Sequence, residues 1–218
     1  MLKAVLWDND GVLVDTEHLY YQACREVLLR YEIPLDEESF IELFLRKSEG
    51  LIALLSERGL SKKLEIAQDW RNRRYTQLLS EGVAPIEGIK ETLTKLQFRV
   101  QMGIVTSSRK EHFELIHSQT ELLKFFDFVL AREDYVTSKP DPEPYLQAMI
   151  RNDLMPDECI VVEDSPRGLQ AANAAGLRCV VIPRGLTFGL NFEGAWIRIK
   201  RVADLIPIVE SLQNSDGT

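Results

Sequence analysis

The chain has 218 residues, of which 45% are hydrophobic and 28% are charged, and its formal net charge at pH 7 is −8. This length suits one α/β domain with a smaller inserted module, and the ordinary composition excludes a disordered or fibrous chain. An acidic surface offers no electrostatic footprint for nucleic acid or anionic lipid. We therefore expect no nucleic-acid partner and no membrane partner.

The cysteines Cys24, Cys159 and Cys179 are widely spaced and form no Cys-x-x-Cys pair. This usage is typical of reduced, buried thiols rather than of a disulfide framework. No apolar stretch is long enough for a signal-peptide core or a membrane span. The sequence thus predicts a cytoplasmic protein. It leaves the oligomeric state open, with a monomer favoured.

The first predicted element is a short apolar strand at residues 2–7 that ends at Asp8-Asn9-Asp10-Gly11. A continuous apolar run of this kind indicates a strand that is buried on both faces of a parallel sheet. From about Thr16 the apolar residues recur at spacings of three and four, which predicts a helix. Further helices are predicted near 36–46, 50–58 and 61–81. We therefore predict an all-helical domain at residues 16–83.

Strands and helices alternate in the rest of the chain. The predicted strands lie at 100–105, 128–130, 159–162 and 178–182, and the predicted helices near 88–96, 108–118, 142–152 and 166–175. Such alternation indicates a parallel sheet with helices on both faces. The predicted fold class is α/β, a doubly wound, Rossmann-like core formed by residues 1–15 and 84–218, with the helical domain inserted at 16–83.

Polar residues follow the predicted strands at the edge where ligands bind in an open parallel sheet. They are Asp8 and Asp10, Thr106 and Ser107, Lys139, and Glu163 and Asp164. Two like charges about 4 Å apart repel by roughly 4 kcal/mol at an effective dielectric near 20. The carboxylates therefore require a cation, and oxygen ligands without His or Cys favour Mg²⁺.

The remaining polar groups at this edge suit a phosphoryl group. Lys139 provides a positive charge, Thr106 provides a hydroxyl, and the start of the following helix provides free backbone N–H groups. A metal ion, a lysine, a hydroxyl and a carboxylate nucleophile are the parts of phosphoryl transfer. Phosphoryl transfer is therefore the chemistry that these residues predict.

The polar residues after the strands belong to four short motifs, and these resemble the motifs of the haloacid dehalogenase (HAD) superfamily, in the subgroup of β-phosphoglucomutase and phosphoglycolate phosphatase-like enzymes. They stand in family order at residues 8–16, 105–107, 138–143 and 162–165. A helical cap inserted after the first motif is also the arrangement of that family. The resemblance implies a HAD-type core with a cap.

The resemblance also implies a role for each matching residue. Asp8 is the expected nucleophile that forms a phosphoaspartate, and Asp10 is the expected general acid/base. Thr106, Ser107 and Lys139 are expected to bind the phosphoryl group. The expected Mg²⁺ ligands are Asp8, the backbone carbonyl of Asp10, and Asp164, with Glu163 in or just behind that shell. Dehalogenation is not expected, because dehalogenase members lack the second aspartate.

Candidate substrate-binding residues lie in the helical domain. The basic run Arg71-Asn72-Arg73-Arg74 is either a solvated helix face or a site for an anionic part of the substrate, read by Arg71 or Arg74. Arg46 is a weaker candidate of the same kind. Tyr20 stands where β-phosphoglucomutase has a histidine. His18, His112 and His117 are expected on helix surfaces, and Trp7 and Trp196 in the core.

The expected function is that of a Mg²⁺-dependent phosphatase acting on a small phosphorylated metabolite, such as a sugar phosphate. A sugar phosphomutase is the alternative among enzymes. Tyr20 and the bulky, charged loop Leu45-Arg46-Lys47-Ser48, in place of a small glycine, weaken that alternative. A non-catalytic protein that binds phosphorylated metabolites is the alternative of another class. The intact set of Asp8, Asp10, Lys139 and Asp164 argues against it.

Overall fold

The computed structural model describes residues 1–47 and 49–214, and within them one parallel six-stranded sheet has the order β3-β2-β1-β4-β5-β6. The strands are β1 (Ala4–Trp7), β2 (Gln101–Val105), β3 (Phe128–Leu130), β4 (Cys159–Glu163), β5 (Arg178–Val181) and β6 (Ile197–Arg198). The strand order reverses at β1, which pairs with β2 on one side and β4 on the other. Ligands bind at such a switch point, beyond the carboxyl ends of the strands.

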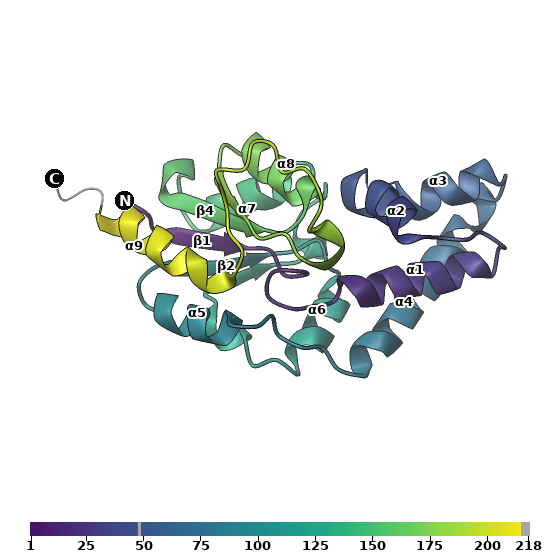
Figure 1. Cartoon of the computed structure of the whole chain (residues 1–218), viewed down its shortest axis with the longest axis horizontal. Helices are drawn as coiled ribbons and strands as arrows, with labels where there is room; N and C mark the ends of the chain where they lie inside the picture. The colour runs from purple at the N-terminus through teal and green to yellow at the C-terminus, as the bar shows by residue number, and fades with distance from the viewer. Residues whose placement is uncertain (48, 215–218) are drawn as a thin grey trace.

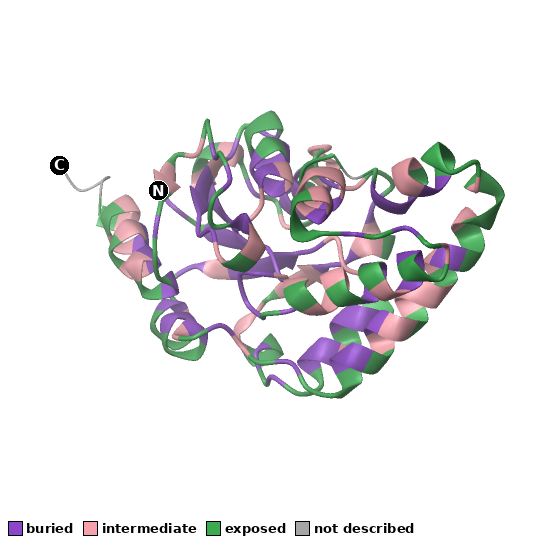
Figure 2. Cartoon of the chain, turned by 45° about the vertical axis from the view of Figure 1, so that its right-hand side comes forward, coloured by how far each residue is buried: buried purple, intermediate pink, exposed green. Residues whose placement is uncertain are grey.

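Side chains of successive strand residues enter two different cores, one on each face of the sheet. In β1, Val5 and Trp7 join one core, whereas Ala4 and Leu6 join the other. The first core is covered by α5 (Ile89–Leu96), α6 (Lys110–His117) and α9 (Leu205–Asn214), and the second by α7 (Glu143–Arg151) and α8 (Pro166–Ala174) (Figure 1). Figure 2 shows the sheet buried between these helices. The predicted fold class is confirmed.

The described residues between β1 and α5 contain helices and no strand. They are α1 (Glu17–Leu29), α2 (Glu37–Phe40), a π-helix (Ile41–Arg46), α3 (Gly50–Glu57) and α4 (Leu64–Ser80). Leu28, Phe40 and Leu55 are fully buried in a third hydrophobic cluster that belongs to this segment. The segment, residues 16–83, is called the helical segment below. It lies beyond the carboxyl ends of the strands (Figure 1).

The two connections between the sheet and the helical segment run side by side. Val14 and Pro85 form an antiparallel bridge. The N–H of Asp15 donates to the carbonyl of Ala84 at 3.1 Å, and the N–H of Ile86 donates to the carbonyl of Leu13 at 2.9 Å. The chain therefore leaves the sheet and returns to it at one point.

Several features differ from the sequence predictions. β6 and α9 were not predicted, because β6 has only two residues and Pro207 in the first turn of α9 obscures a helical pattern. The prediction of a buried Trp196 is wrong: the side chain is partly exposed, and the Arg178 guanidinium lies 5.0 Å from its ring centroid. The surface positions predicted for His112 and His117 are also wrong, since both are buried.

The shorter 3₁₀ helices lie in the connections: Ser61–Lys63, Leu123–Phe125, Arg132–Asp134, Pro156–Glu158, Gly185–Thr187 and Val202–Asp204. Among the described residues, no helix has both the length and the apolar character that crossing a membrane requires.

Candidate active site

Lys139 lies at the centre of the site and is almost completely buried. Its Nζ donates to Asp8 Oδ1 at 2.7 Å, to Glu163 Oε1 at 2.7 Å and to the carbonyl of Val105 at 2.8 Å. Burial alone lowers the pKa of Lys139, but the carboxylates of Asp8 and Glu163 outweigh it and raise that pKa above its usual value. The lysine therefore remains a cation and joins the ends of β1, β2 and β4.

The carboxylates beside Lys139 are under strong electrostatic pressure. Burial, followed by the charge of Glu163, raises the pKa of Asp8 to about 7, although Lys139 opposes this rise. Burial, with the nearby charge of Glu17, also raises the pKa of Asp164 well above its usual range. A second cation beside these two carboxyls would lower their pKa values and favour their ionised forms at neutral pH.

The residues present fit a hard divalent cation. Asp8, Glu163 and Asp164 place carboxylate oxygens within 4.8 Å of one another, and neither His nor Cys belongs to the group. Gly11 has a φ of +81°, and a Cβ on it would overlap the Asp164 carboxylate. Only glycine allows the loop after β1 to approach Asp164 this closely.

Glu163 is held by protein donors on both carboxylate oxygens. Oε1 accepts from Lys139 Nζ and from Tyr145 Oη at 2.8 Å, and Oε2 accepts from the N–H of Asp164 at 3.2 Å and from Ser165 Oγ at 3.2 Å. A Cβ on Gly168 would overlap this carboxylate, so α8 can begin directly against it. The predicted place of Glu163, in or just behind the metal shell, stays a prediction.

Asp10 is surrounded by hydrogen-bond donors. Its Oδ1 accepts from Thr16 Oγ1 at 2.5 Å, and its Oδ2 accepts from Ser108 Oγ at 2.6 Å, from Asn9 Nδ2 at 3.3 Å and from Thr106 Oγ1 at 3.4 Å. Sequence reasoning missed Thr16 and Ser108. Their positions inside the first motif and the Thr-Ser-Ser run were the available signals, but hydroxyl residues also cap helices.

Thr106 and Ser107 differ in how their hydroxyls are used. Thr106 Oγ1 is buried, and it accepts from the N–H of Ser108 at 3.0 Å while facing Asp10. Ser107 Oγ is also buried, but it has no hydrogen-bond partner among the described residues, and Ser107 lines the cavity above the site. Ser107 therefore offers the hydroxyl that is free for a bound group.

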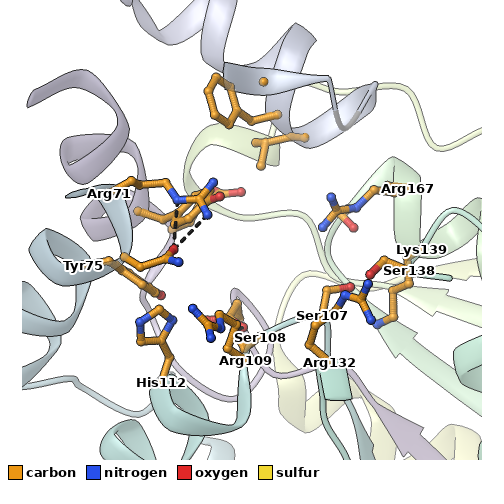
Figure 3. A pocket seen from close by; sticks show the side chains of 18 of the residues that line it. Arg71, Tyr75, Ser107, Ser108, Arg109, His112, Arg132, Ser138, Lys139 and Arg167 are labelled. Atoms are coloured by element: carbon orange, nitrogen blue, oxygen red, sulfur yellow. Dashed lines mark hydrogen bonds between the residues drawn. The ribbon is translucent and has the colours of Figure 1, made fainter. Parts of the chain in front are cut away.

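A cavity of about 650 Å³ lies between the sheet edge and the helical segment. Lys139, Ser107 and Arg132 line it from the core, whereas Arg71 and Tyr75 line it from α4 (Figure 3). Gly50, the first residue of α3, also lines the cavity, although the sequence suggested no small glycine in the loop over the substrate. Gly50 removes one argument against a mutase. Ser48, part of the loop used in that argument, lies outside the described residues.

Arg71 is a cation that is held by neutral groups. Its Nε and Nη2 donate to Asn72 Oδ1 at 3.2 and 2.8 Å, as Figure 3 shows, and its guanidinium carbon lies 5.3 Å from the Tyr20 ring centroid. Within residues 1–47 and 49–214, no carboxylate forms an ion pair with it. Tyr20 also lines the cavity. Arg71 and Tyr20 thus lie where the sequence predicted substrate-binding residues.

Arg74 and Arg46 lie elsewhere. Arg74 Nε donates to Glu26 Oε2 at 2.6 Å, which joins α4 to α1. Arg46 is exposed and pairs with Glu42 at 3.4 Å. Neither is among the residues that line the cavity. Each is engaged with a carboxylate of its own segment, so the structure brings neither arginine to the cavity, and their contact with substrate stays a prediction.

Glu17 is a cavity residue that sequence reasoning missed. It follows Thr16 directly and lies in the first turn of α1. Burial, followed by the charges of Asp10 and Asp15, raises the pKa of its carboxyl to about 7. A half-buried carboxyl in this position can accept a hydrogen bond from a hydroxyl group of a ligand or, when protonated, donate one to it.

Comparison with known proteins identifies the relatives of the chain. The family described as "Haloacid dehalogenase-like hydrolase" matches residues 5–182. A Thermotoga maritima protein named "Phosphorylated carbohydrates phosphatase" is 30% identical, over 94% of this chain and 95% of that protein. A Bacillus subtilis protein named "Beta-phosphoglucomutase" is 27% identical, over 94% and 92%.

Among solved structures, CbbY from Rhodobacter sphaeroides in complex with xylulose-(1,5)bisphosphate has a TM-score of 0.80 and 26% identity, over 94% of this chain and 96% of that one. The predicted family and the prediction of an enzyme are confirmed. With a family match over most of its length and the acidic site at the expected sheet edge, the chain belongs to the haloacid dehalogenase-like hydrolase family.

Proposed function

We propose that the protein is a Mg²⁺-dependent phosphatase that hydrolyses a small phosphorylated carbohydrate through a phosphoaspartate on Asp8. The observation that carries this proposal is the buried cluster in which Lys139 bridges Asp8 and Glu163 at 2.7 Å each, with Asp164 beside them. Burying an ammonium group together with three carboxyl groups costs free energy of desolvation, which residues with a purely structural role do not require.

In the first step, an Asp8 carboxylate oxygen forms a bond to phosphorus while the bond from phosphorus to the leaving oxygen breaks. Asp10 gives its proton to the leaving alcohol. In the second step, Asp10 accepts a proton from water as the water oxygen attacks phosphorus, and Asp8 is released with free phosphate. Asp8 and Asp164 would hold Mg²⁺, with the backbone carbonyl of Asp10 and with Glu163 behind them.

Bound there, Mg²⁺ would offset part of the negative charge of the carboxylates and of the phosphoryl oxygens. The Lys139 charge beside Asp8 stabilises the anionic phosphoryl group, and the unpartnered hydroxyl of Ser107 can donate to one of its oxygens. Thr106 instead holds Ser108 and faces Asp10. In this proposal Ser107 binds the phosphoryl group and Thr106 orders the loop.

The substrate is proposed from the other wall of the cavity. Arg71, a cation without an ion-pair partner among the described residues, suits an anionic or hydroxyl-rich part of the substrate away from the transferred phosphate. Glu17 suits a hydroxyl group. The two named relatives above carry phosphorylated carbohydrates or a phosphosugar in their names. A sugar phosphate provides a phosphoryl group for the sheet edge and hydroxyl groups for Arg71 and Glu17.

We further infer that residues 16–83 form a cap domain that closes over the substrate. Tyr20, Gly50 and Arg71 line the cavity from this segment, and its two connections to the core meet at the bridge between Val14 and Pro85. Closure of such a cap excludes water from the first step, and its opening admits water for the second.

The test is a screen of phosphorylated sugars, glycolate, nucleotides and polyol phosphates for phosphate release with Mg²⁺. Phosphate release that is lost in EDTA and in the Asp8→Asn variant is the expected result. Full activity without metal, or no release from any phosphomonoester, would contradict the proposal and favour a protein that only binds phosphometabolites.

A phosphomutase is the second candidate, because Gly50 lies in the cavity wall and a β-phosphoglucomutase is among the relatives. It is tested with β-glucose 1-phosphate, Mg²⁺ and a trace of glucose 1,6-bisphosphate. Glucose 6-phosphate formed much faster than free phosphate would establish the mutase. We expect phosphate release without isomerisation.

A further inference from the structure

His117 lies at the end of α6 and is buried with Asn9, the residue between the two aspartates of the first motif. The Nε2 atom of His117 lies 2.8 Å from Asn9 Oδ1, and its Nδ1 atom lies 2.8 Å from Thr120 Oγ1. Neither His117 nor Thr120 lines the cavity. The proposed reaction therefore does not use these residues directly.

The hydrogen bonds define the direction of this chain of contacts. Asn9 Nδ2 donates to Asp10 Oδ2 at 3.3 Å, so Asn9 Oδ1 faces His117 and must accept from it. His117 then carries its proton on Nε2, and its bare Nδ1 accepts from the Thr120 hydroxyl, whose oxygen accepts from the N–H of Leu122 at 3.4 Å. Burial lowers the pKa of His117 to about 4, which keeps the ring neutral.

We propose that His117 is a positioning residue for proton transfer: its Nε2–H fixes the Asn9 amide with the NH₂ group toward Asp10, and so orients the Asp10 carboxylate. The proposal rests on the acid/base role of Asp10 in the proposed function. It adds to that role a contact that connects Asp10 to a residue 107 positions away in the sequence, through Asn9.

Asn9 differs in kind from the other side-chain donors to Asp10. Thr16, Thr106 and Ser108 donate through hydroxyls, whose hydrogens rotate freely about the C–O bond. The amide of Asn9 has fixed donor directions, and His117 determines which end faces Asp10. If the amide turned over, its oxygen would face the carboxylate and its NH₂ group would face the Nε2 hydrogen. The histidine thus prevents one specific misorientation.

The experiment compares two substrates that differ in their need for an acid. The p-nitrophenolate of p-nitrophenyl phosphate leaves without a proton, whereas the alkoxide of an alkyl phosphate requires one. We expect Asn9→Leu and His117→Leu to lower kcat/KM for an alkyl phosphate from the screen roughly tenfold, and for p-nitrophenyl phosphate less than about threefold. His117→Gln, which keeps an N–H near the position of Nε2, should restore the alkyl phosphate rate to within about threefold of wild type.

The double variant Asn9→Leu/His117→Leu separates positioning from packing. The double variant leaves neither Asn9 nor His117 as an unpaired buried polar group, and only the Thr120 hydroxyl loses its acceptor, as it already does in His117→Leu. Its unfolding midpoint should therefore recover in part relative to the single variants. We expect the selective loss on the alkyl phosphate to persist in this stable protein. Recovery of the alkyl phosphate rate together with stability would overturn the proposal, because the pair would then be structural only.

Asp10→Asn is the control for the proposed function. It should show a larger selective loss on the alkyl phosphate than any Asn9 or His117 variant. A variant Asp10→Asn without that selectivity would contradict the acid role of Asp10 itself. Selectivity in Asp10→Asn but not in Asn9→Leu or His117→Leu would leave the proposed function intact and reject only the role of His117.

Discussion

The sheet edge and the helical segment hold their functional side chains in different ways. Lys139 is almost fully buried, and its ammonium group joins Asp8 and Glu163, which are 131 and 24 residues away along the chain. Arg71 is held by its neighbour Asn72 and by the ring of Tyr20. The groups proposed for chemistry thus depend on contacts between the ends of different strands, whereas the group proposed for recognition depends on contacts within the helical segment and can change without disturbing the sheet edge.

The largest effect is expected at Asp8. Asp8→Asn should lower kcat by about 10⁴-fold or more, because the variant lacks the proposed nucleophile, while the circular dichroism spectrum remains unchanged. Asp69→Asn, which changes an exposed carboxylate in the helical segment, serves as the control and should retain wild-type activity. An Asp8→Asn protein with more than about a tenth of the wild-type rate would disprove the assignment.

The next effect compares the two regions through their ion pairs. Lys139→Met should lower the free energy of unfolding by about 3–5 kcal/mol, because Asp8 and Glu163 lose their buried counter-charge. Arg74→Met, which breaks the partly exposed pair with Glu26, should cost less than about 1 kcal/mol. Urea unfolding in the presence of EDTA measures both. Equal losses would show that burial does not distinguish the two sites.

The third prediction concerns pH and His117, whose pKa is about 4 in the folded protein, below its usual value of 6.5. Between these pH values the unfolded chain binds a proton that the native protein does not. The stabilisation is therefore complete above pH 6.5 and decreases as the pH falls toward 4. As the pH falls from 6.5 to about 4, the free energy of unfolding should therefore decrease by roughly 2–3 kcal/mol.

The His117→Gln variant should lack this loss. Asp8 and Glu17 also titrate in this range, but with raised pKa values and the opposite effect on stability. They are present in both proteins, so the difference between the two pH profiles isolates His117. Parallel profiles would mean that the histidine is protonated in the folded protein.

The smallest effect is expected in the helical segment. Arg71→Gln should raise KM about tenfold for the best substrate of the screen and leave kcat within about twofold of wild type, because the lost interaction is the same in the ground and transition states. Arg73→Gln, which changes an exposed arginine paired with Asp69, is the matched control. A fall in kcat without a change in KM would place Arg71 in the chemistry rather than in recognition.

The sequence was sufficient to predict the sheet edge, because parallel strands bring their carboxyl ends together whatever the details of packing. Asp8, Asp164 and Lys139 could therefore be grouped from their positions after apolar runs. The pair formed by Asn9 and His117 could not, since a histidine at a helix end has no sequence feature that reveals a partner 108 residues away.

The arginines of α4 show the same limit. Arg71 and Arg74 are three positions apart and lie on neighbouring faces of one helix, so periodicity alone could not separate them. The position of Glu26 on α1 decides between them, because it captures Arg74 and leaves Arg71 at the cavity. Only the packing of α1 against α4 contains that information.

The bridge between Val14 and Pro85 bears on how such a protein can diversify. Because the two ends of residues 16–83 are already adjacent, the entropy of closing that segment depends only weakly on its length. A replacement segment of another size could be inserted between the same two residues without changing strand register or the distances between the catalytic groups. Selection could therefore exchange substrate recognition as a single unit while it conserves the chemistry.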